Sequence, residues 1–114
     1  MVVDDCLFCG IVAGDVEAEV VHATERTVAF RDLNPQAPTH VLVVPRDHFA
    51  NAAELASGDP AASAELVTAA AAVATAEGHD DYRLVFNTGP GAGQSVFHTH
   101  LHVLAGRSLT WPPG

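Results

Sequence analysis

Three histidines, His98, His100 and His102, alternate with single intervening residues near the carboxyl end of the chain. β-Branched and apolar residues flank them, which is typical of a β-strand whose alternate side chains share one face. At about 3.3 Å per residue, the outer two imidazoles would lie roughly 13 Å apart, too far to wrap easily around one ion. We therefore expect the three histidines to have different roles. The alternatives are a metal-binding tract and a half-exposed strand with chance histidines.

A glycine-rich segment, residues 87–95, leads into the histidines. It is not a dinucleotide-binding fingerprint, because a strand rather than a helix is expected to follow it. The segment brings backbone N–H groups and the Ser95 hydroxyl to the strand that carries the imidazoles. Oriented N–H groups next to protonatable imidazoles form a plausible cradle for phosphate. The alternative is a turn in which glycine only permits the backbone conformation.

Two cysteines, Cys6 and Cys9, are separated by two residues near the amino terminus. A redox-active pair with this spacing is expected in a βαβ context, which the following residues do not supply. The pair could instead be half of a zinc site, which needs two further ligands from elsewhere in the chain. Incidental thiols are the third interpretation, and the motif by itself does not decide between them.

Hydrophobic periodicity and breaker residues predict the elements that must position these groups. The apolar run at 39–45 is too continuous for an exposed edge strand. His40 lies near its start and His48 just beyond its end. Asp59 can cap a long helix that has Pro60 at its first position. The other expected elements are a short helix from Cys6 to Ala13 closed by Gly14, strands at 20–21, 27–33 and 82–87, a short helix at 48–56, and the long helix to Glu77 with Leu66, Ala70, Val73 and Ala74 on one face.

Length and charge exclude several classes of function. The 114 residues predict a single domain spanning 1–114, and fourteen acidic against five basic residues give a net charge of −9. No basic stripe is present to displace counterions from a nucleic-acid polymer. No apolar run is long enough for a membrane span, and the first residues lack the features of a signal peptide. We expect a soluble, cytoplasmic protein that binds neither membranes nor nucleic-acid polymers.

The motif at 98–104, His-Thr-His-Leu-His-Val-Leu, resembles the signature of the histidine triad (HIT) family. The resemblance extends over nearly the whole chain, through Leu7-Phe8, Phe30-Arg31-Asp32 and the segment Pro-Gln-Ala-Pro-Thr-His at 35–40. The final Trp-Pro-Pro-Gly at 111–114 resembles the tail of the histidine triad nucleotide-binding (Hint) branch. One departure is Thr99, where the family usually has an apolar residue. Because Thr99 points away from the triad face, the departure bears on packing more than on chemistry.

The resemblance implies an α+β fold with a five-stranded antiparallel sheet, one long helix, one or two short helices, and a homodimer. It also implies binding of a purine nucleoside monophosphate unit. The substrate-binding residues implied by analogy are Phe8, Ile11, Phe30 and Leu33 at the base, Asp32 at the ribose hydroxyls, Asn87, Gly93, Gln94 and Ser95 around the phosphate, and Trp111 in a tail that docks near the partner's active site.

The resemblance assigns catalytic roles as well. His100 matches the nucleophile, His102 would hold a phosphate oxygen, His40 would support proton transfer, and Ser95 would donate to the phosphate. Histidine at 102, where related nucleotidyltransferases have glutamine, favours hydrolysis. The implied activity is hydrolysis of purine nucleoside phosphoramidates through a nucleotidyl-histidine intermediate. The alternatives are a dinucleoside polyphosphate or acyl-adenylate hydrolase, and a nucleotide-binding interaction module with incidental turnover.

Some bacterial members of the family bind structural zinc through a Cys-x-x-Cys pair and two histidines. By this resemblance the four ligands would be Cys6, Cys9, His48 and His98. Two sulfurs and two imidazoles close a tetrahedral shell and leave no position open for water. We therefore expect one structural zinc per chain, remote from turnover.

Overall fold

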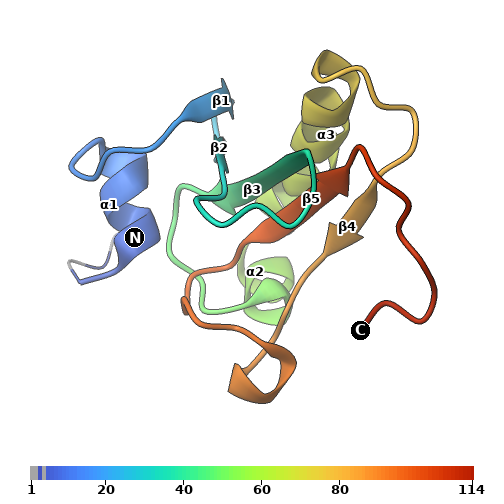
Figure 1. Cartoon of the computed structure of the whole chain (residues 1–114). Coiled ribbons are helices and arrows are strands. Elements are labelled where there is room, and N and C mark those ends of the chain that lie inside the picture. The colour runs from blue at the N-terminus through green and yellow to red at the C-terminus, as the bar shows by residue number, and fades with distance from the viewer. Residues whose placement is uncertain (1–2, 4) are drawn as a thin grey trace.

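The computed structural model describes residue 3 and residues 5–114, and its elements are drawn in Figure 1. The five strands form one antiparallel sheet in the order β1-β2-β3-β5-β4. This is the expected α+β architecture. The elements are α1 (Leu7–Ala13), β1 (Val20–Ala23), β2 (Thr27–Arg31), β3 (Thr39–Pro45), α2 (Ala52–Gly58), α3 (Pro60–Ala76), β4 (Arg83–Val85), the 3₁₀ turn η1 (Pro90–Ala92) and β5 (Leu101–Ala105).

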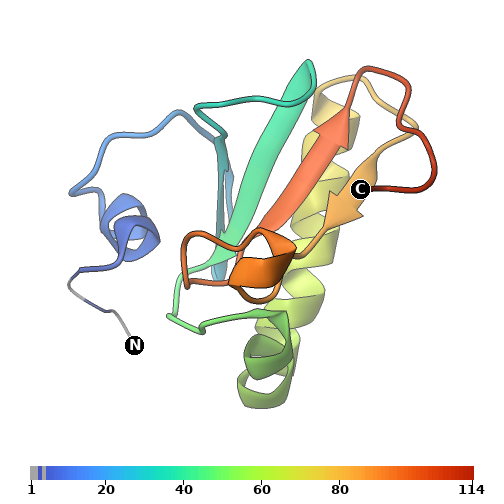
Figure 2. The same ribbon diagram turned by 60° about the horizontal axis from the view of Figure 1, so that its bottom comes forward.

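Strand β3 lies at the centre of the sheet and is buried along its whole length, as its continuous apolar run predicts. Its alternate side chains belong to two different cores. Val41 and Val43 face the core beneath α3, whereas Leu42 and Val44 face the core that packs against α1. Figure 2 shows α3 along one face of the sheet and α1 beside the opposite face. The α1 face also carries His40 and His102, because His102 pairs directly with Leu42.

The long helix α3 begins as predicted, with the Asp59 carboxylate accepting a hydrogen bond from the Ala62 N–H at 3.1 Å. The predicted stripe of Leu66, Ala70, Val73 and Ala74 is buried. Leu66, Ala70 and Val73 belong to the same core as Val41 and Val43 of β3. Within the described part of the chain, no helix is long and apolar enough to cross a membrane.

The histidine strand is shorter than the alternation predicts, because β5 begins only at Leu101. The N–H and the hydroxyl of Thr99 both donate to the Phe49 carbonyl, at 2.7 and 3.0 Å. The Thr99 N–H is therefore not available to pair with a neighbouring strand of the sheet. His98 and His100 therefore precede the strand. The 13 Å separation assumed an extended chain and does not describe this bent segment.

Other boundaries also differ from the predictions. The short helix α2 starts at Ala52 rather than at 48, because Asn51 caps it by accepting from the Glu54 N–H at 3.0 Å. Strand β2 ends at Arg31, two residues earlier than expected, and β4 covers only 83–85 of the expected 82–87. Helix α1 ends before Gly14, whose φ of 82° is a conformation that glycine adopts readily, as predicted.

Candidate active site and adjoining cysteine–histidine cluster

A pocket of about 270 Å³ opens on the α1 side of the sheet. Ten residues expected at the site line it: Phe8, Ile11, Phe30, Asp32, Leu33, Asn87, Gly93, Ser95, His100 and His102. Six residues that the sequence analysis did not assign to the site complete the walls: Leu7, Glu17, Ala18, Arg31, Leu42 and Val96. Leu42 could have been found from its period-two relation to His40, whereas Glu17 and Ala18 carry no comparable signal.

One end of the pocket is apolar and the other is polar. The Phe8 and Phe30 rings pack edge to face with centroids 5.4 Å apart. Leu33 stands at the rim with 98% of its surface exposed, so it has room to cover a flat ligand. Asp32 already accepts a hydrogen bond from the Asn34 N–H through one carboxylate oxygen, at 2.8 Å, and its other oxygen lies 3.4 Å from His40 Nε2.

A chain of hydrogen bonds determines which nitrogen of His102 carries the proton. The Gln36 N–H donates to His40 Nδ1 at 3.0 Å, so a neutral His40 holds its proton on Nε2. That nitrogen lies 2.9 Å from His102 Nδ1 and donates to it. A neutral His102 consequently carries its proton on Nε2, which is buried and has no hydrogen-bond partner among the described residues. A ligand oxygen in the pocket would supply the missing acceptor.

A different hydrogen bond determines the tautomer of His100, whose neutral ring carries its proton on Nδ1 rather than on Nε2. His100 Nδ1 lies 2.8 Å from the His98 carbonyl oxygen, which can only accept, so Nδ1 must donate. In the neutral ring, Nε2 then bears a free lone pair. The His100 ring packs against Phe8 and His102, with centroid distances of 5.1 Å to each. The pocket thus combines a nucleophilic nitrogen from one histidine with a donating nitrogen from the next.

Burial favours the neutral forms of His102 and His40 by lowering the pKa of each ring. The pKa of His102 is lowered to about 4, mainly because burial disfavours the charged ring. Repulsion from His100 and His40 adds to the shift, and Asp32 opposes it. Burial also lowers the pKa of His40, again with Asp32 opposing. A neutral ring is the form that has the tautomers described above.

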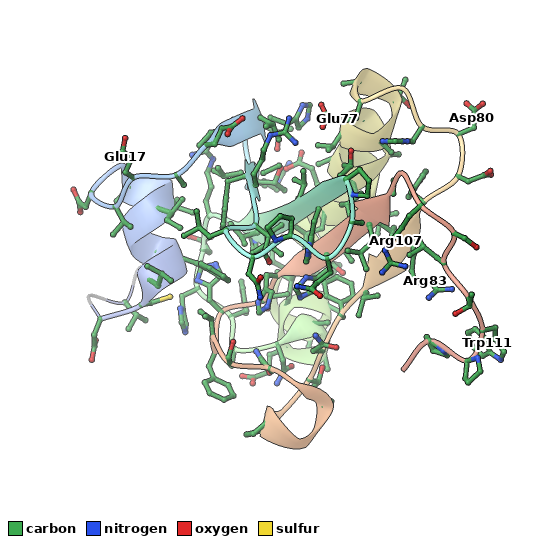
Figure 3. All side chains as sticks on the ribbon, viewed as in Figure 1. Glu17, Glu77, Asp80, Arg83, Arg107 and Trp111 are labelled. Atoms are coloured by element: carbon green, nitrogen blue, oxygen red, sulfur yellow. The ribbon has the colours of Figure 1, made fainter. Side chains whose placement is uncertain are left out.

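Three residues expected at the site do not line the pocket. Gln94 is buried, accepts from the Gly89 N–H at 2.9 Å, and donates to the Ala50 and Val96 carbonyls at 2.7 and 3.0 Å. Its side chain therefore braces the glycine-rich loop and does not face a phosphate. His40 does not line the pocket itself and is linked to it by its hydrogen bond to His102 Nδ1. Trp111 is 82% exposed and lies away from the pocket of its own chain (Figure 3).

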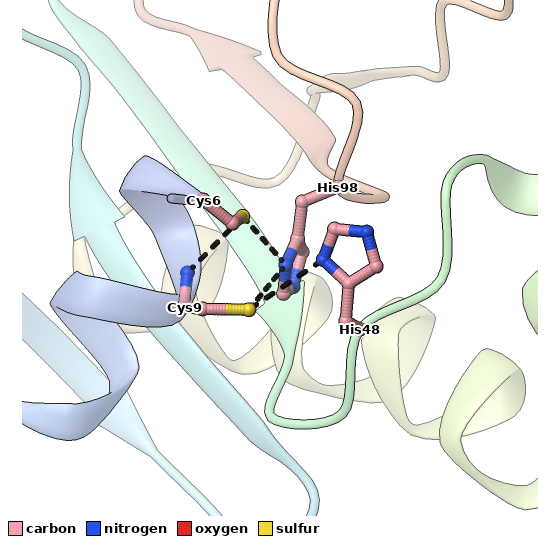
Figure 4. Close-up of side chains that lie close together, drawn as sticks. All are labelled: Cys6, Cys9, His48 and His98. Carbon is pink, nitrogen blue, oxygen red and sulfur yellow. Dashed lines mark hydrogen bonds between the residues drawn. The ribbon is translucent and has the colours of Figure 1, made fainter. Parts of the chain in front are cut away.

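A cluster of Cys6, Cys9, His48 and His98 lies beside the pocket, as predicted (Figure 4). His98 Nδ1 is 3.4 Å from Cys6 Sγ and 3.5 Å from Cys9 Sγ, and His48 Nδ1 is 3.5 Å from Cys9 Sγ. A tetrahedral zinc ion with typical bond lengths holds sulfur and nitrogen about 3.6 Å apart. His98 Nε2 donates to the Pro45 carbonyl at 2.9 Å, so the neutral ring turns its lone pair on Nδ1 toward the sulfurs. The donor set fits zinc.

Comparison with known proteins decides the family. The HIT domain family matches residues 13–109. The chain belongs to the HIT family. It superposes on the crystal structure of a HIT family hydrolase from Legionella pneumophila with a TM-score of 0.92 and 46% identity, covering 96% of this chain and all of the other. The predicted family and its fold are thereby confirmed.

Two curated relatives have nearly the same length as this chain. An uncharacterized HIT-like protein of Synechococcus elongatus is 43% identical over 112 residues, which cover 97% of this chain and 98% of the relative. A maize protein named 14 kDa zinc-binding protein is 41% identical over 111 residues, covering 95% of this chain and 87% of the relative. The alignments thus cover the whole domain rather than the histidine motif alone.

In this HIT chain the cysteine–histidine cluster lies next to the pocket, although no residue of the cluster lines it, so a metal held there would be less remote than expected. His98 belongs to the cluster through its ring and orients His100 through its carbonyl oxygen. Phe8 lies between the two cysteines in sequence, and its ring contacts His98 and His100 at centroid distances of 6.0 and 5.1 Å. A displacement of the cluster would therefore be transmitted to the His100 ring through the His98 backbone and through the Phe8 ring.

A second group of possible ligands, Asp32, His40 and His102, is a poor metal site. A cation between the imidazoles would need lone pairs on both His40 Nε2 and His102 Nδ1. The Gln36 N–H that donates to His40 Nδ1 holds the His40 proton on Nε2, where the cation would have to bind. The facing nitrogens are instead joined by a hydrogen bond.

The lowered pKa of His102 predicts that acid destabilises the fold. The unfolded chain binds a proton at this residue near pH 6.5, whereas the folded chain does so only near pH 4. The free energy of unfolding therefore falls as the pH drops from about 6.5 toward 4. We expect the melting temperature to fall over this range, and to fall less steeply in His102→Gln. If the melting temperatures of the two proteins fall equally between pH 7 and 4.5, the lowered pKa of His102 is contradicted.

Proposed function

We propose that the protein hydrolyses the P–N bond of purine nucleoside phosphoramidates and releases a nucleoside monophosphate and an amine. One observation carries the proposal: the free lone pair of His100 Nε2 and the unpartnered donor His102 Nε2 belong to the same pocket. A nucleophile and a donor for a phosphate oxygen are the two groups that covalent nucleotidyl transfer requires. The apolar end of the pocket, formed by Phe8 and Phe30, suits a purine, and Asp32 suits the ribose hydroxyls.

The reaction would proceed in two displacements at phosphorus. His100 Nε2 forms a bond to phosphorus while the P–N bond breaks. The electron pair of the broken P–N bond stays on the amine nitrogen, which takes up a proton from water. Water then attacks the nucleotidyl-histidine, and the bond to His100 breaks. His102 Nε2–H, the Ser95 hydroxyl and the N–H groups of the 93–95 segment would hold the phosphate oxygens in both steps.

The alternative substrates, acyl-adenylates and dinucleoside polyphosphates, would bind in the same pocket and differ from phosphoramidates in the leaving group. A kinetic panel decides between them: adenosine and guanosine phosphoramidates, an acyl-adenylate and a diadenosine polyphosphate, each assayed for kcat/KM. We expect the phosphoramidates to have the highest values. A higher value for an acyl-adenylate or a dinucleotide would replace the proposed substrate. Tight nucleoside monophosphate binding without turnover of any compound would favour the interaction module.

We also propose that Cys6, Cys9, His48 and His98 hold one structural zinc ion. When bound, the ion would tie α1 to the loops that carry the two histidines. The geometry of the donor atoms and the maize relative's name support this assignment. Metal analysis of the purified protein should find about one equivalent.

We expect a homodimer, as in the Hint branch that the tail resembles. Arg83 holds the start of the tail by donating to the Leu109 and Thr110 carbonyls at 3.3 and 2.9 Å, and Trp111 beyond them is left exposed (Figure 3). Docking near a partner's pocket would cover this ring. Light scattering at micromolar concentration should give twice the monomer mass, and deletion of residues 111–114 should change substrate preference. A monomer would contradict the dimer, and an unchanged preference would contradict the docking.

A further inference from the structure

A second cavity, of about 450 Å³, adjoins the proposed nucleotide pocket. Leu7, Ser95 and Val96 line both cavities, so the two share these residues at their common rim. The remaining residues that line the second cavity are Val3, Asp5, Cys6, His48 and Phe97, of which Cys6 and His48 also belong to the cysteine–histidine cluster. His100 and His102 do not line it.

The walls of the second cavity define the chemistry of a ligand. Phe97 and Leu7 are each 50% exposed, although both are large apolar side chains. Asp5 adds a carboxylate at the edge, and His48 presents an imidazole whose Nδ1 is turned toward Cys9. An apolar group that carries a positive charge or a hydrogen-bond donor complements such a surface, whereas a second carboxylate would be repelled.

Displacement at phosphorus determines the direction in which the amine leaves. The attacking and leaving atoms lie roughly in line on opposite sides of the phosphorus. His100 attacks from within the nucleotide pocket, so the departing group points away from His100. Ser95, which lies on the shared rim, would stand between the phosphate and whatever occupies the second cavity.

We propose that the second cavity is a leaving-group subsite, which binds the amine portion of the phosphoramidate and favours aromatic or branched apolar amines over acidic ones. The proposal rests on the proposed P–N hydrolysis. When the P–N bond breaks, the nitrogen keeps the electron pair and takes up one proton from water, which gives a neutral amine. The free amine then takes up a second proton from water, because the pKa of an alkylamine is about 10. The resulting ammonium ion lies beside Asp5, and its apolar substituent packs on Phe97 and Leu7.

The test compares adenosine 5′-phosphoramidates that differ only in the amine: ammonia, phenethylamine, propylamine and β-alanine. We expect the full-length protein to prefer the phenethylamine conjugate to the ammonia conjugate. Phe97→Ala should reduce that preference about tenfold, the effect of losing roughly one buried aromatic contact. Phe86→Ala, which removes an exposed phenylalanine outside both cavities, is the matched control.

A second variant tests the charge. Asp5→Asn should narrow the gap between the propylamine and β-alanine conjugates, and Asp15→Asn, outside both cavities, should not. Hydrolysis of the ammonia conjugate without any dependence on the amine would overturn the subsite and leave the proposed function standing. If Phe97→Ala lowers kcat/KM by the same factor for all four conjugates, the subsite is overturned too. Failure to hydrolyse any of the four compounds would overturn both proposals together.

Discussion

Replacing His100 with alanine is expected to abolish turnover while leaving nucleoside monophosphate binding almost intact. The residue offers the pocket a free imidazole lone pair, because the His98 carbonyl holds its proton on Nδ1. The binding surface is provided by other side chains, chiefly the Phe8–Phe30 pair and Asp32. Loss of a covalent nucleophile typically lowers kcat by about 10⁴ to 10⁶. The dissociation constant for the monophosphate should change only a few-fold.

Two measurements check the role of His100 directly. Acid-quenched enzyme should retain label from phosphate-labelled substrate, and His100→Ala should retain none. Two successive displacements preserve the configuration at phosphorus, whereas a single attack by water inverts it. His22→Ala, on the edge strand β1 and outside the pocket, is the matched control and should remain active. Inversion, or an active His100→Ala enzyme, would rule out the covalent intermediate.

Removal of the metal is expected to lower both stability and turnover. The four proposed ligands come from the start of α1, the segment after β3 and the segment before β5, so a bound ion would join three parts of the chain. Its loss should lower the melting temperature by about 10 °C or more, because binding of a structural metal contributes to the free energy of folding. Displacement of His98 would also move the carbonyl that orients His100, and kcat should fall about 10- to 100-fold.

Chelated wild-type protein and Cys9→Ser should behave alike, and His22→Gln should keep one equivalent of metal and full stability. A readout independent of activity is the ¹⁵N spectrum of the His100 ring. Metal-loaded protein should show the proton on Nδ1, and metal-free protein should show a mixture of tautomers. If metal-free protein has an unchanged kcat and an unchanged ring spectrum, the cluster and the nucleophile are independent.

Local patterns predicted the elements well where one physical cause dominates. The continuous apolar run of β3 requires burial on both faces, and Asp59 with Pro60 specifies the start of α3. The Cys-x-x-Cys spacing left three interpretations open until the family resemblance supplied His48 and His98. Predictions failed where a group distant in sequence forms a hydrogen bond with the backbone of an expected strand. The Phe49 carbonyl accepts from both the N–H and the hydroxyl of Thr99, and β5 begins only after this residue.

The sequence by itself indicated which side chains line the pocket, because its motifs resemble those of the family and the period-two alternation of the strands puts paired residues on one face. Phe30 of β2 and His102 of β5 both pair with Leu42 of β3, so all three lie on the α1 side of the sheet. Only the tertiary structure decided what each group does there. The tautomers of His100 and His102 depend on the His98 carbonyl and the Gln36 N–H, and Gln94 turns inward because three backbone groups of the loop and of residue 50 need partners. Such hydrogen bonds join atoms that no local pattern relates, so they are defined only once the chain has folded.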